Sequence, residues 1–163
     1  MTKAFNLLSR ILSWICFGLM ILFTILVAVQ VISRYVFNSP TTWTELVARY
    51  LFVWTMFLYM PVMYRDKANA AFTLLHDKVK PGIRKWFDII ADAFVLFMSS
   101  YLLYWGLEFC MRMSSKMITG LGIGVRIPMN VAYSAIPVGA GLLALYAIER
   151  LIGEISVLIK GGK

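Results

Sequence analysis

Long stretches without a charged residue constrain this sequence most. A run of 23 uncharged residues ends before Arg34, and another of 22 ends before Glu149. Each exceeds the roughly 20 residues that a helix needs to cross a hydrocarbon core of about 30 Å. Two runs of 15 uncharged residues reach that length if the adjoining turn is included. We therefore predict an all-α integral membrane protein with four transmembrane helices, at about residues 11–33, 46–64, 86–107 and 128–148.

The composition agrees with a membrane environment. Of the 163 residues, 61% are hydrophobic and 15% are charged, whereas soluble domains are about half apolar and about a quarter charged. We predict a single membrane domain over residues 1–163. A cleaved signal peptide is disfavoured, because the first apolar stretch is too long. The segment of about residues 66–82 places apolar residues beside lysines, which favours a short amphipathic surface helix between spans two and three.

The distribution of basic residues predicts the orientation. Eleven of the 16 Lys and Arg residues lie in the N-terminal tail, the 65–85 connection and the C-terminal tail. Cytoplasmic segments carry such an excess, so both termini are expected to be cytoplasmic. Anionic lipid headgroups explain the net charge of +8 better than nucleic acid does, because no basic folded face is visible.

One connection gathers charge next to the apolar runs. Arg34 ends span one, and Glu45 and Arg49 stand four residues apart at the start of span two, where they can pair on one helix face. Trp43 suits the headgroup level. Two interpretations stay open: the three charged side chains extend to lipid headgroups, or they clamp spans one and two together or bind a partner helix or a lipid phosphate.

Further charges flank span three. Arg84 and Asp88, and Glu108 and Arg112, are spaced as pairs on a helix, and Asp92 shares a face with Asp88. A carboxylate inside a membrane suggests an ion relay. These residues lie near the cytoplasmic end beside basic side chains, however, so we favour neutralised interfacial charge pairs.

Span four contains the helix-packing candidates Pro137, Gly139 and Gly141. Small residues let helices approach closely, and the proline is expected to kink the helix. One histidine, His76, and two distant cysteines are too few for an intrachain haem or metal site. We therefore predict no cofactor and no enzymatic activity. An alternative function is a self-sufficient homodimeric multidrug-type transporter, but such proteins need a mid-span acid that span one lacks.

Three segments together resemble a known family. They are RYVFNSPTTWTELVARYLFVW, RDKANAAFTLLHDKV and LGIGVRIPMNVAYSAIPVGAGLL. Their order and spacing, over about residues 20–148, resemble the small integral-membrane subunit of tripartite ATP-independent periplasmic (TRAP) transporters. Many members have two consecutive acids where Thr44 and Glu45 stand, and Gly-His-Ile where residues 68–70 are Ala-Asn-Ala. The first difference leaves a single acid beside Arg34 and Arg49.

The resemblance implies a function without catalysis. It implies a scaffold subunit for a large multi-span membrane subunit, within a sodium-coupled secondary transporter of the bacterial inner membrane. A periplasmic binding protein would deliver an organic acid of the sialic acid or C4-dicarboxylate class. The residues that carry the resemblance near the first connection are Arg34, Glu45 and Arg49.

Overall fold

The computed structural model describes residues 3–38, 42–66, 81–117 and 128–160, and these form helices and turns without a strand. The helices are α1 (Lys3–Tyr35), α2 (Thr42–Arg65), α4 (Pro81–Arg112), α5 (Met129–Tyr133) and α6 (Ala135–Lys160). Four segments are long and apolar enough to cross a membrane, with α5 and α6 together forming the fourth. The predicted all-α fold with four candidate spans is confirmed. Most of the expected amphipathic segment 66–82 lies outside the described residues.

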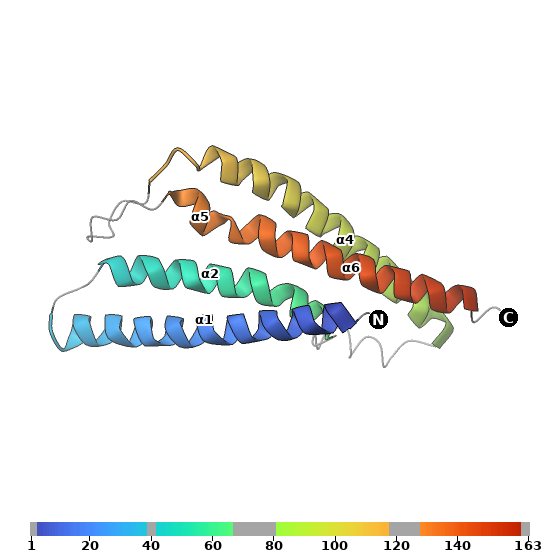
Figure 1. Cartoon of the computed structure of the whole chain (residues 1–163), viewed down its shortest axis with the longest axis horizontal. Coiled ribbons are helices and arrows are strands. Elements are labelled where there is room, and N and C mark those ends of the chain that lie inside the picture. Colours follow the sequence, from blue (N-terminus) through green and yellow to red (C-terminus); the bar gives the residue numbers. More distant parts are fainter. Residues whose placement is uncertain (1–2, 39–41, 67–80, 118–127, 161–163) are drawn as a thin grey trace.

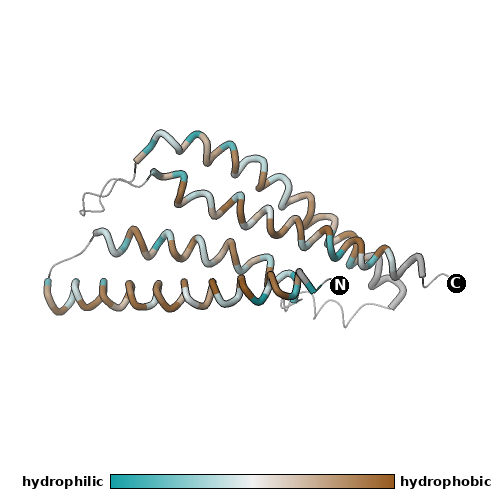
Figure 2. The backbone as a smooth tube through the Cα atoms, viewed as in Figure 1, coloured by the Kyte–Doolittle hydropathy of each residue, from teal (hydrophilic) through white to brown (hydrophobic). Residues whose placement is uncertain are grey.

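The four long helices lie side by side in the order α4, α6, α2, α1 (Figure 1). α6 contacts both α4 and α2, and α2 contacts both α6 and α1. Both chain ends lie at one end of this layer, which we call the N/C end; the opposite end is the loop end (Figure 1). Hydrophobic residues cover most of the length of α1 (Figure 2). Among the long helices, α1 packs mainly on α2 and α4 packs mainly on α6, so α1 and α4 are the edge helices of the layer.

The helices are longer than the charge-free runs. α1 begins at Lys3 rather than near residue 11, and α6 continues to Lys160 rather than ending near residue 148. Glu149 and Arg150 do not end α6, because both side chains turn toward the other helices and form ion pairs there.

Pro137 accounts for the boundary between α5 and α6. Proline has no N–H to donate to the carbonyl of the residue four positions earlier, and its ring crowds that carbonyl. The residue in that position is Tyr133, at which α5 ends. The helical pattern resumes across the break: the N–H of Val138 donates to the carbonyl of Ser134 at 3.1 Å.

At Gly139, α6 approaches α2 closely. A Cβ atom at this position would lie 2.8 Å from Cβ of Phe57 and 2.9 Å from its carbonyl carbon, and closer still to its oxygen. Any other residue would force the backbones apart. Phe57 is also four residues before Pro61, which cannot donate to the Phe57 carbonyl. Gly139 therefore packs against the part of α2 where one backbone carbonyl lacks its usual helical donor.

The main apolar core lies toward the N/C end. Tyr146 and Ala147 of α6 are fully buried there, and Val62 of α2 is 1% exposed. A smaller group surrounds Ala132 of α5 at the loop end. The helices are thus packed most completely where the polar cluster described next is found.

Candidate functional site

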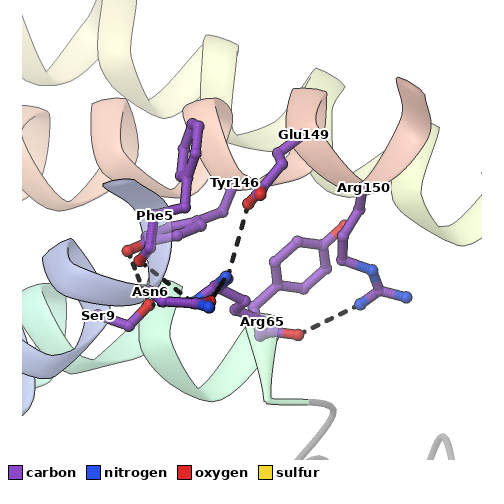
Figure 3. A network of polar contacts seen from close by, with 8 residues as sticks. Phe5, Asn6, Ser9, Arg65, Tyr146, Glu149 and Arg150 are labelled. Atoms are coloured by element: carbon purple, nitrogen blue, oxygen red, sulfur yellow. Dashed lines mark hydrogen bonds and ion pairs between the residues drawn. The ribbon is translucent and has the colours of Figure 1, made fainter. Parts of the chain in front are cut away.

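Charged side chains meet inside the helix layer at the N/C end (Figure 3). They come from the end of α2, the first half of α4 and the second half of α6, and the start of α1 adds polar groups. We call this set the charged cluster; its members are Asn6, Ser9, Tyr64, Arg65, Asp92, Tyr146, Glu149 and Arg150.

Arg65 joins three helices. Its side chain is 8% exposed, and its Nε lies 3.6 Å from Oε2 of Glu149 on α6. One terminal nitrogen donates to the carbonyl of Phe5 at 3.2 Å and to Oγ of Ser9 at 2.8 Å, and the other donates to Oδ1 of Asn6. The last residue of α2 is thereby bound to the start of α1 and to α6 (Figure 3).

Tyr146 supports this arrangement from α6. Its hydroxyl is 2.9 Å from Oγ of Ser9. The guanidinium carbon of Arg65 stands 5.6 Å from the centre of its ring, within cation–π range. Phe5 meets the same ring edge-on at 5.5 Å. The tyrosine therefore provides Arg65 with an aromatic surface in a region that excludes water.

Arg150 forms the second half of the cluster. Its Nε lies 3.2 Å from Oδ2 of Asp92 on α4, and Asp92 is 1% exposed. A terminal nitrogen donates to the carbonyl of Tyr64 at 3.2 Å, and another lies 3.6 Å from Oε1 of Glu154. The Tyr64 hydroxyl donates to Oδ1 of Asp92 at 2.7 Å. Arg150 consequently links α6 to both α4 and α2.

Charge balance shows what the cluster can do. Each buried carboxylate, Asp92 and Glu149, faces its own arginine. Such pairing offsets the large cost of taking charges out of water. A carboxylate held this way stabilises the geometry of the cluster. The cluster therefore fixes the N/C ends of the four long helices relative to one another.

The predicted charge pairs of α4 have different environments. Asp92 belongs to the buried cluster rather than to the lipid interface. Glu108 and Arg112 form an ion pair within α4, with the arginine side chain 70% exposed. The side chain of Arg84 lies outside the described residues, so its pairing with Asp88 stays a prediction.

The predicted group at the first connection is exposed. Arg49 and Glu45 form a 2.9 Å ion pair within α2, with side chains 64% and 54% exposed. Arg34 lies over the ring of its neighbour Tyr35 at 5.9 Å, and within the described residues no ion pair joins Arg34 to Glu45. Trp43 is 36% exposed. These contacts of Arg34, Glu45 and Arg49 are thus local, and their role toward lipid or a partner helix stays a prediction.

Of the eight members of the cluster, sequence reasoning singled out only Asp92. It missed the three other charged members, Arg65, Glu149 and Arg150, because they lie outside the predicted spans. A signal was present. Arg150 follows Leu143 and Tyr146 at spacings of seven and four, so it continues the buried face of α6. An apolar stripe that ends in a charge predicts that the charge also faces inward.

The comparisons with known proteins place the chain in a family. The sequence model of the DctQ component of tripartite ATP-independent periplasmic transporters matches residues 23–157. This chain belongs to the DctQ family. It is accordingly a small permease subunit of a TRAP transporter, with helices long enough to span a membrane.

Three relatives show how the family is organised. A Haemophilus influenzae protein, named as a candidate TRAP transporter small permease protein, is 28% identical over 96% of this chain and 94% of its own length. The isethionate TRAP transporter permease protein DctMQ of Oleidesulfovibrio alaskensis is 23% identical over 73% of this chain, but only 18% of its own. The sialic acid TRAP transporter permease protein SiaT of H. influenzae is 28% identical over 87% of this chain and 22% of its own. In the two longer relatives the matching region is therefore part of a much larger permease chain.

Proposed function

We propose that this chain is the non-catalytic scaffold subunit of a sodium-coupled TRAP transporter, where it holds a large membrane subunit that carries the substrate and ion sites. The observation that carries the proposal is the DctQ match over residues 23–157 on four membrane-length helices. The DctMQ and SiaT relatives support the partner, because the matching region forms about a fifth of each of those chains.

The charged cluster supports a static role. Arg65 and Arg150 bind partners on every neighbouring long helix, through groups that are about nine-tenths buried. Breaking a buried pair by removing one partner costs about 3–5 kcal/mol, so the helices resist sliding against each other. A rigid subunit of this kind suits the part of a transporter against which a moving part slides.

The names of two relatives indicate a class of substrate. These two relatives are named for sialic acid, a carboxylate, and isethionate, a sulfonate. We infer that the transporter takes up an organic acid of this kind, or a C4-dicarboxylate, delivered by a periplasmic binding protein. We further propose the bacterial inner membrane, with the N/C end cytoplasmic, since most Lys and Arg residues lie toward that end.

Reconstitution tests this proposal. Proteoliposomes containing this chain and its large subunit, with the binding protein outside, should accumulate labelled organic acid when a sodium gradient is applied. Proteoliposomes with the small chain alone should not. Substrate binding by the purified small chain, or transport by it alone, would overturn the proposal.

A reporter fusion tests the orientation. Fusing a cytoplasm-active fluorescent protein after Lys163 should give fluorescence, and fusing a periplasm-active phosphatase there should give no activity. The reverse result would contradict the inference drawn from the basic residues.

A further inference from the structure

An apolar groove of about 590 Å³ runs along α2. Met20 of α1, Val95 of α4 and Leu143 of α6 contribute to its walls, and α2 provides the other lining residues. Several of them are methionines, whose flexible side chains adapt to an irregular partner surface. The groove is thus an apolar surface whose methionine side chains can adjust to the shape of a partner.

A regular stripe of exposed side chains continues this groove along α2. We call it the α2 stripe; its members, alternately four and three residues apart, are Glu45, Arg49, Phe52, Met56, Tyr59 and Met63. The four apolar members line the groove and are 38–59% exposed. Alternating spacings of four and three residues are the repeat by which one helix packs lengthwise on another.

The chain exposes enough area to accommodate a large subunit interface. A folded monomer of this mass exposes about 8,200 Å², whereas this chain of 18.6 kDa exposes 11244 Å². The excess is at least what one partner contributes to an obligate interface, about 1,000–2,500 Å². In a membrane, lipid and a second protein can share this surface, and its area is sufficient for an obligate subunit interface.

The chemistry of α2 distinguishes a protein partner from lipid. The span of α1 has a mean hydropathy of 2.7, whereas those of α2 and α4 both have 1.5. α2 differs from α4 because it supplies eight of the eleven residues that line the groove. The exposed side of α1 is mainly aliphatic, as at Ile25 and Val29, whereas the α2 stripe is aromatic, methionine-bearing and charged at one end. Aromatic residues and methionine are enriched at protein interfaces. The ion pair of Glu45 and Arg49 has no net charge, so it offers little attraction to an anionic headgroup.

We propose that the α2 stripe and its groove receive one transmembrane helix of the large subunit, an inference that rests on the proposed function. The receiving surface is apolar from Phe52 to Met63 and polar at Glu45 and Arg49. The matching helix presents small or β-branched apolar residues toward the groove. At the level of the ion pair it presents a polar side chain, because an ion pair covered by a purely apolar surface is costly.

Photo-crosslinking in the assembled complex identifies the occupant. The photoreactive amino acid p-benzoylphenylalanine is placed at the Met56 position or, as a control of similar exposure, at the Ile25 position of α1; the two side chains are 59% and 53% exposed. Each variant is co-expressed with the large subunit and irradiated in membranes. We expect at least ten times more small–large adduct from position 56 than from position 25. Equal yields, an adduct between two small chains, or an adduct only with phospholipid would each overturn the inference.

A substitution provides an independent test. Met56→Trp fills the groove, and Ile25→Trp is the matched control; both sites are exposed, so each variant chain should unfold at the wild-type temperature in detergent. We expect Met56→Trp to lower the amount of large subunit recovered with the tagged chain about tenfold, and Ile25→Trp to leave it unchanged. Equal recovery with both variants overturns the inference alone. Failure of the wild-type chain to recover any large subunit overturns the proposed function itself.

Discussion

Replacing Asp92 by alanine should destabilise this chain strongly. The carboxylate is 1% exposed and faces Arg150 at 3.2 Å. Removing one partner of a buried ion pair costs about 3–5 kcal/mol. Arg150 keeps the Tyr64 carbonyl at 3.2 Å and Glu154 at 3.6 Å, so the lower end applies. The Tyr64 hydroxyl also loses its acceptor, at a cost of at least about 1 kcal/mol. Asp92→Ala should therefore lower the free energy of unfolding by about 4 kcal/mol.

The assay compares two ion pairs in the same chain. Unfolding of the purified chain in mild detergent is followed by circular dichroism during a denaturant titration, for Asp92→Ala and for Glu45→Ala. Glu45 also pairs with an arginine, at 2.9 Å, but both side chains are more than half exposed. Exposed pairs contribute about 0–1 kcal/mol. If Asp92→Ala costs no more than Glu45→Ala, then the charged cluster is solvated and does not hold the helices together.

A double variant separates the lost interaction from the stranded charge. Arg150→Met in the Asp92→Ala background removes the unpaired guanidinium and leaves an apolar side chain of similar length. Replacing both members of a buried pair by apolar groups is often neutral or stabilising. We therefore expect the double variant to be more stable than Asp92→Ala alone. Losses that simply add would contradict a direct coupling between these two residues.

Three further substitutions test other parts of the structure by the same unfolding measurement. Gly139→Ala should lower the free energy of unfolding by about 1–3 kcal/mol, because the added Cβ would meet the Phe57 backbone. Gly141→Ala is the control and should cost little, because the nearest atom to its Cβ would be 3.7 Å away. Equal losses of stability in the two variants would contradict the close approach at Gly139. Arg65→Met should cost about 3–5 kcal/mol, since it leaves Glu149 without its cation, and the buried oxygens of Glu149 accept no hydrogen bond from the part of the chain that the structure describes. An unfolding midpoint equal to that of the wild type would contradict this. Trp54→Phe should cost about 0.5–1.5 kcal/mol by removing the 3.3 Å bond from its ring N–H to the Val131 carbonyl, and no change would show that the bond contributes nothing.

The sequence predicted those features of the fold that depend on local physics. Charge-free runs predicted four candidate spans, because a helix in hydrocarbon must satisfy its own backbone and carry apolar side chains. Pro137 indicated a distortion, and α5 ends four residues before it. Gly139 was a packing candidate on size alone, and the Phe57 backbone lies where its Cβ would be. Each of these features depends on one residue and its immediate neighbours.

The charged cluster could not be predicted in the same way. The prediction of orientation treats Lys and Arg residues outside the spans as loop residues. It therefore does not identify an arginine whose side chain points into the protein. Arg65 and Arg150 have acidic partners 84 and 58 residues away, at Glu149 and Asp92. Those partners are known only once α6 lies between α2 and α4. Spacing identifies partners within one helix, as for Glu45 and Arg49, but not across helices.

The two kinds of ion pair suggest different tasks for the two ends of α2. At the N/C end, Arg65 finds its partners within this chain, so that end can be fixed before any other subunit binds. At the loop end, Glu45 and Arg49 pair with each other at the surface. Covering an exposed pair requires the covering surface to offer polar groups of its own, since otherwise desolvation opposes contact. The apolar part of the α2 stripe therefore provides contact area for many possible helices, whereas Glu45 and Arg49 select the one that brings a polar group to their level.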